Sequence, residues 1–140
     1  MCLDIIVPTS KVDGITTFGP TPEVLTAEED IICYKLLQLS GENHAFSEYS
    51  YEGYPFRYDI GVRNPYQSII LHTTNKIHYS VHKGYHSFKS EPTHHINSII
   101  FGNLKCYKCI IPKGSNYIPG FENTRLGYVS SEIIVVGKTI

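Results

Sequence analysis

A near-continuous apolar run, IICYKLLQL, occupies residues 31–39 and limits what this chain can fold into. Its length and its branched side chains favour a buried β-strand over a helix. The composition points the same way, because the chain has 11 Tyr, no Trp and a single Met, and β-branched and aromatic residues are enriched in strands. We therefore expect a β-rich core rather than a helical bundle.

The length of 140 residues and the hydrophobic content of 41% suit one globular domain over residues 1–140. A chain of this size buries roughly two-thirds of its unfolded surface. Residues 1–20 contain several Gly and Pro, so we expect an arm or a short edge strand followed by a loop. The sequence has no apolar segment of membrane-spanning length, and we expect no signal peptide, because its first residues lack a basic start and a small-residue cleavage site. A cytoplasmic protein is expected.

Two short helices are expected beside the strands. Thr21-Pro22-Glu23 has the signals of a helix start, and Ser90-Glu91-Pro92 opens a second helix that ends near Phe101. The sequence predicts strands at residues 31–39, 67–73, 76–82, 104–111 and 132–136, a break at 84–88 and a loop at 116–127. These elements define an α+β domain with about four to six strands and two short helices.

Residues 76–82 alternate between apolar and polar side chains. The pattern predicts that Ile77, Tyr79 and Val81 are buried, while His78 and His82 face solvent or a cleft.

Charge is distributed unevenly along the chain. Residues 76–113 contain six lysines and one acid, whereas residues 1–59 contain ten acids and three basic residues. Such asymmetry indicates either an anionic partner or two parts of one domain that attract each other.

Cys106-x-x-Cys109 lies on an expected strand, where its two thiols would point to opposite faces. That geometry disfavours a shared metal, so small buried side chains are the main interpretation; zinc with His94 and His95, or a redox pair, are the alternatives. Without a secretion signal, reduced thiols are expected. We expect no metal and no cofactor.

Three segments resemble a small protein family of bacteriophages and gut bacteria. They are AEEDIICYK at residues 27–35, GYHSF at 84–88, and CIIPKGSNY at 109–117 followed by GYVS at 127–130. The resemblance implies a phage-like protein, and thus a host cytoplasm, and carries no activity.

A candidate site for an anionic, phosphate-bearing ligand lies where the basic stretch meets the tyrosine-rich residues 40–65. The binding residues would be Tyr54, Arg57, His78, His82, Lys83 and His86. Gly84 would bring backbone N–H groups close to the ligand, and the guanidinium of Arg57 would bind phosphate. The acidic N-terminal part is the rival partner of the lysines, and a second subunit, in a homo-oligomer, could complete the cleft.

Two classes of function remain open. The first is a non-catalytic binding module that sequesters a small nucleotide-type anion or docks on a host protein. The alternative is a small nucleotide-directed transferase similar to ADP-ribosyltransferases, with Lys35, Ser87 and Glu132 in the order of that fold's site residues. Nucleic-acid binding is disfavoured by the formal net charge of -1 and the absence of reader motifs, and a membrane partner is not expected.

Overall fold

The computed structural model describes residues 3–39, 44–47, 57–73, 75, 77–81, 83–92, 104–122 and 125–139. Within these ranges the chain contains strands and no helix. The strands form one 12-stranded sheet and a separate 2-stranded sheet made of β2 (Thr9–Val12) and β3 (Ile15–Phe18). The predicted α+β class is therefore wrong, and the described chain is all-β.

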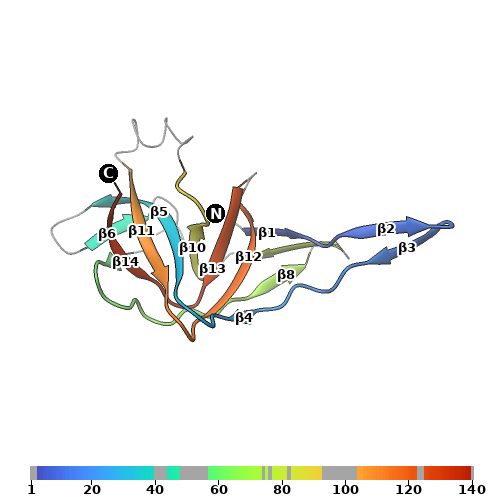
Figure 1. Cartoon of the computed structure of the whole chain (residues 1–140), viewed down its shortest axis with the longest axis horizontal. Helices are drawn as coiled ribbons and strands as arrows, with labels where there is room; N and C mark the ends of the chain where they lie inside the picture. Colours follow the sequence, from blue (N-terminus) through green and yellow to red (C-terminus); the bar gives the residue numbers. More distant parts are fainter. Residues whose placement is uncertain are drawn as a thin grey trace.

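The main sheet has the strand order β14-β11-β5-β10-β13-β12-β1-β9-β8, and neighbouring strands are antiparallel. These strands are β14 (Ile134–Lys138), β11 (Lys105–Ile111), β5 (Ile31–Leu39), β10 (Tyr85–Phe88), β13 (Arg125–Ser130), β12 (Asn116–Glu122), β1 (Leu3–Ile6), β9 (His78–Val81) and β8 (Leu71–Thr73). Three short strands lie off this path: β4 (Leu25–Thr26) pairs with β12, and β6 (His44–Ser47) pairs with β5 and with β7 (Arg57–Asp59). Figure 1 shows the sheet curving to form the body of the molecule, from which β2 and β3 project.

Two apolar clusters fill the body. The larger one lies on the face of β5 and β11 that carries Cys33, Leu37 and Cys109. The smaller one packs Leu3 of β1 with Val81 of β9 and with side chains of β12 and β13. The strand predicted for residues 31–39 is confirmed as β5, although Ile32, on its other face, is 51% exposed.

The helix expected after Thr21 does not form. Residues 21–24 have no regular structure, and β4 follows, where Leu25 pairs with Tyr117 and Thr26 with Asn116. Two prolines, Pro20 and Pro22, suit an extended chain, and the edge of β12 supplies pairing that the local helix signal ignored. For the second expected helix, residues 90–92 are not helical, and residues 93–101 lie outside the described residues.

Two segments that were expected to be irregular are strands of the main sheet. Residues 84–88, expected to be a break, contain β10, and residues 116–127, expected to be a loop, contain β12 and the start of β13. The glycines that suggested a loop are sites of close backbone contact: a Cβ on Gly120 would lie 2.8 Å from the Asp4 carbonyl oxygen, and one on Gly127 would lie 2.6 Å from that of Ser87.

The alternation predicted for residues 76–82 is only partly seen. Val81 is fully buried, as expected, but Ile77, His78 and Tyr79 are all half-buried, and Ser80 is only 8% exposed. Because β9 lies between β1 and β8, Ser80 is flanked by Asp4 and His72 and is covered despite its polar side chain. His82 lies outside the described residues.

No described segment is a helix with the length and apolar character needed to cross a bilayer.

Candidate functional site

The residues predicted to bind an anion lie on different parts of the sheet. Arg57 lies on β7 and is paired at 3.5 Å with Asp59, both side chains being exposed. His78 lies on β9, and its Nε2 is 3.1 Å from Oδ1 of Asp4. Between β7 and β9 the strand order passes through β6, β5, β10, β13, β12 and β1. Tyr54 and His82 lie outside the described residues, so this set stays a prediction.

Lys83 and His86 flank Gly84 and are half-buried, His86 being on β10. Gly84 has a φ of +122°, and a Cβ there would lie 2.4 Å from Cγ1 of Val129. Close packing against Val129 of the neighbouring strand therefore explains why a glycine occupies position 84. A bound ligand is not needed to explain it.

Among the described residues, the lysine that lies in the interior of the body is Lys35. Lys35 is 6% exposed; its Nζ donates a hydrogen bond to the carbonyl oxygen of His86 and lies 4.9 Å from the centre of the Tyr58 ring. A ring face and a carbonyl oxygen both stabilise a cation away from water. Tyr58 is itself stacked at a tilt on Tyr85, with ring centres 5.6 Å apart.

The cysteine thiols near Lys35 are poor nucleophiles. Burial raises the pKa of Cys33 to about 11, against smaller opposing effects of the Ser87 hydroxyl and of Lys35. Burial also raises the pKa of Cys109, which is the cross-strand partner of Cys33, and that of Cys106. A thiol reacts as a nucleophile or binds a metal in its thiolate form. Because their pKa values are raised, these three thiols form little thiolate near neutral pH. Among the described residues, no three His, Cys, Asp or Glu side chains form a metal-binding group.

The transferase hypothesis requires Lys35, Ser87 and Glu132 to converge. Lys35 and Ser87 lie on β5 and β10, which are paired, but both are buried. Glu132 is engaged elsewhere, because its Oε2 is 2.6 Å from a guanidinium nitrogen of Arg63 and accepts a hydrogen bond from the Ser115 hydroxyl at 3.3 Å. In this arrangement the Glu132 carboxylate connects Arg63 with Ser115, and its role is structural.

A different feature is the two-stranded sheet β2–β3, hereafter the arm (Thr9–Phe18). Figure 1 shows it extending away from the body, and all eight of its strand residues are exposed. Asp13 and Gly14 form its turn with φ values of 52° and 78°, as a tight hairpin with the twist of its strands requires. The arm contributes to neither apolar cluster of the body.

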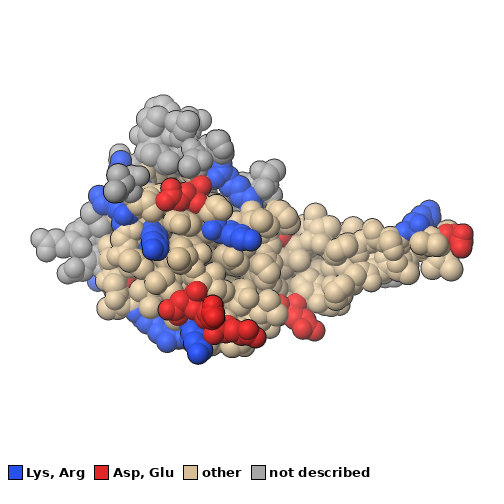
Figure 2. All heavy atoms as spheres, viewed as in Figure 1, with Lys and Arg blue, Asp and Glu red and all other residues tan. Residues whose placement is uncertain are grey.

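The tip of the arm carries an apolar pair beside its charged turn residue Asp13. Val12 pairs with Ile15, and the two side chains are 66% and 67% exposed. The next pair on the same face, closer to the body, is Ser10 and Thr17. Their hydroxyl oxygens lie 2.7 Å apart and form a hydrogen bond. The only charges of the arm are Lys11 and Asp13, and Figure 2 shows one basic and one acidic side chain at its far end.

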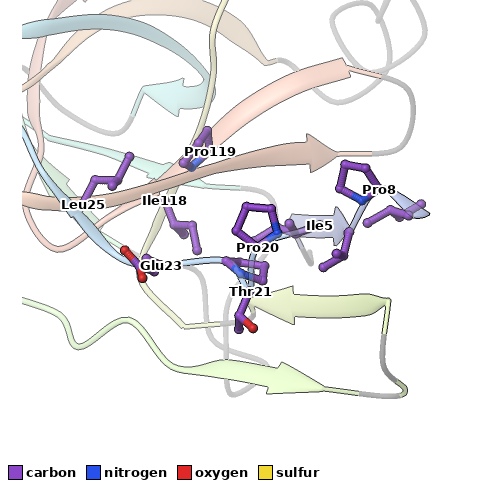
Figure 3. Close-up of a pocket in the computed structure, with 11 residues that line it drawn as sticks. Ile5, Pro8, Pro20, Thr21, Glu23, Leu25, Ile118 and Pro119 are labelled. Carbon is purple, nitrogen blue, oxygen red and sulfur yellow. The ribbon is translucent and has the colours of Figure 1, made fainter. Parts of the chain in front are cut away.

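An apolar groove lies at the base of the arm. It has a volume of about 360 Å³ and is lined by residues 5–8, 118–119 and most of 20–25. Figure 3 shows Pro8 at one end and Leu25 at the other, with Pro20 and Ile118 between them. Glu23 is the one charged residue of the lining. The groove and the Val12–Ile15 pair therefore lie at opposite ends of the arm, with the polar residues 9–11 and 16–17 between them.

The sequence contained the signal for this arm. Asp13-Gly14 between TSKV and ITTF is a hairpin signature, and the expectation of a loop after the first residues does not take it into account. Comparison with known proteins adds no further assignment, since no family model, curated protein or solved structure matches this chain. The resemblance to phage and gut bacterial proteins stays a prediction.

Proposed function

We propose that this chain is a non-catalytic binding module that acts in the cytoplasm and docks on a protein through its arm. One observation carries the proposal: a hairpin of ten residues projects with every strand residue exposed and ends in the apolar pair Val12 and Ile15. A lone two-stranded hairpin is marginally stable in water, and this one projects from the body and carries its apolar pair away from both apolar clusters. The arm therefore acts where a partner covers it.

The interior chemistry supports a role without catalysis. The described thiols have raised pKa values, Glu132 is bonded to Arg63, and Lys35 is enclosed by Tyr58 and the His86 carbonyl group. None of these groups combines a nucleophile with an adjacent base on an open surface, which is the arrangement that covalent catalysis needs.

The test is a photo-crosslinking residue placed at Ile15, with the same residue at Val136 as control. Val136 is a 47% exposed strand residue of the body. In the cells in which the chain occurs, position 15 should give one saturable protein adduct of defined mass, which the Val12→Asp change removes. Equal adducts at positions 15 and 136, or none at 15, would refute docking through the arm.

A further inference from the structure

We infer that the protein docked on the arm adds a β-strand to the outer edge of β3, so that the arm becomes a three-stranded sheet. The inference rests on the proposed function, because it names the kind of segment that the partner supplies. That segment is extended and has an apolar residue where it passes Ile15. The starting point is the pairing of the arm, because in the described chain β3 pairs with β2 and with no other strand.

The ladder inside the arm shows which backbone groups point outwards. The N–H group of Gly19 donates to the Pro8 carbonyl oxygen at 2.7 Å, so these two residues at the base of the arm form a hydrogen-bonded pair. Hydrogen-bonded and non-hydrogen-bonded pairs alternate along an antiparallel ladder. The register therefore makes Lys11 and Thr16 a non-hydrogen-bonded pair, and the N–H and C=O groups of Thr16 point away from β2, along the outer edge of β3.

The other edge strands of the described sheets are protected against pairing with a foreign chain. Residues 60–64 cover the outer edge of β14. The strands β8 and β4 have only three and two residues, β7 carries the exposed ion pair of Arg57 and Asp59, and β2 carries Lys11. Covering segments, short strands and charged side chains are the usual means of preventing contact between sheet edges.

The strand β3 has none of these protections. Its four residues, ITTF, include no charge and no proline, and all four are exposed. Such β-branched and aromatic side chains favour strand pairing. The open edge also defines the shape of its partner, because N–H and C=O groups spaced as in a strand are matched by the backbone of another extended segment. A helix does not match them, since its backbone groups are bonded within the helix.

The side chains of β3 indicate the chemistry of the added strand. Neighbouring side chains on one face of a sheet contact each other across the strands, so one residue of the added strand lies beside Ile15, which is 67% exposed. An apolar residue there covers Ile15 together with Val12, its partner on β2. Every named strand of the described chain already has a partner strand, so the added strand comes from another molecule.

The first experiment uses the photo-crosslinking residue at Ile15 as the reporter of docking. Thr16→Pro removes the outward N–H group of β3 and no hydrogen bond of the arm, and proline is tolerated at such edge positions. It should lower the adduct yield at least about tenfold. Thr9→Pro is the matched control and should leave the yield unchanged, because Thr9 pairs with Phe18 and its N–H group points to the outer edge of β2. An NMR contact between the Hα atoms of Lys11 and Thr16 confirms that each variant keeps the hairpin.

The second experiment leaves the edge of β3 intact and moves the crosslinking residue along it, from Ile15 to Thr17. These two side chains lie on one face of β3, and so do their neighbours on an added strand. Mass spectrometry identifies the partner residue captured from each position. The captured residue should shift by two positions along a single partner segment, and the direction of the shift shows whether the added strand is parallel or antiparallel to β3.

The outcomes separate this inference from the proposed function. If the adduct at position 15 survives Thr16→Pro, or the captured residues do not shift by two, the arm docks through its side chains alone: the proposed function stands and the added strand is wrong. Equal losses in Thr16→Pro and Thr9→Pro would also overturn the edge of β3 as the site. An adduct with twice the mass of the chain would place a second copy where the inference places a different protein, and no adduct at position 15 would refute both proposals.

Discussion

Gly84 has a backbone conformation that side chains rarely adopt, with a φ of +122°, and its Cα faces Cγ1 of Val129. We predict that Gly84→Ala lowers the free energy of unfolding by about 1–3 kcal/mol for the backbone strain and by a further ~1–3 kcal/mol for overpacking. Gly61→Ala is the control, because Gly61 has a φ of +83° but open space beside it, so only the first effect applies. Urea unfolding measures the free energy of unfolding of both variants. Equal decreases would show that the Val129 side chain can move aside without an energetic penalty.

The thiols make a second prediction at the residue scale. Burial raises the pKa of Cys33 to about 11, so about one thiol in a thousand is ionised at pH 8. In the native protein iodoacetamide should label the half-buried Cys106 first and Cys33 far more slowly, and labelling of Cys33 should accelerate as the pH rises towards 11.

Peptide mass spectrometry after timed labelling measures these rates. In urea the pKa of each thiol returns to its ordinary value, so the differences should disappear. Native Cys33 that reacts as fast as Cys106 at pH 8 would mean that the face shared by β5 and β11 opens readily.

At the scale of elements, Asn64 joins the segment after β7 to the residue before β14. It is 3% exposed; its Oδ1 accepts a hydrogen bond from the Asp59 N–H group at 3.0 Å, and its Nδ2 donates to the Ile133 carbonyl oxygen at 3.2 Å. We predict that Asn64→Ala lowers the free energy of unfolding by about 2–4 kcal/mol, because buried partners on two segments lose their bonds.

Asn75 provides the comparison for Asn64. Its Oδ1 also accepts backbone hydrogen bonds, from the N–H groups of Ile77 and His78, but it is exposed. Water can replace those bonds, so Asn75→Ala should cost about 1 kcal/mol or less. Thermal or urea unfolding of the two variants compares their stabilities. If Asn64→Ala lowers the free energy of unfolding less than Asn75→Ala does, the buried hydrogen bonds of Asn64 do not stabilise the fold as predicted.

The elements differ in how well the sequence predicted them. β5 and β11 are predicted correctly because their sequences, IICYKLLQL and KCYKCII, are rich in apolar residues, many of them branched, even though the buried face of β5 also contains Lys35. β10 and β12 were missed because Gly84, Gly120 and Gly127 look like loop residues, whereas each allows a close contact with a neighbouring strand or its side chains. Only the tertiary pairing shows which purpose a glycine serves. The helix start at Thr21-Pro22 failed for a related reason, since the open edge of β12 decided the conformation of residues 25–26.

At the scale of the molecule, the sequence predicted a charged site from the clustering of lysines and histidines between residues 76 and 113. The fold places β9 and β10 in different neighbourhoods, β9 between β1 and β8 and β10 between β5 and β13. Closeness along the chain therefore did not produce closeness in space for His78 and His86. The arm depends less on the fold, because a hairpin forms from local sequence, and its Asp13-Gly14 turn could have been predicted.

The last prediction concerns the independence of the arm from the body. We replace residues 9–18 by an Asn-Gly turn between Pro8 and Gly19, whose backbone groups are already joined by a hydrogen bond of 2.7 Å from Gly19 N to Pro8 O. Since no arm residue belongs to either apolar cluster, the free energy of unfolding, measured where the chain is monomeric, should change by no more than about 0.5 kcal/mol.

Leu3→Ala is the control for this deletion. Leu3 lies on β1, directly before the arm, and is 1% exposed in the smaller apolar cluster, so its truncation should cost about 2–5 kcal/mol. A comparable loss on deleting the arm would show that the arm supports the body rather than a partner. A body that keeps its stability would instead be consistent with an arm that acts in contacts with another chain, as the proposed docking through the exposed Val12–Ile15 pair expects.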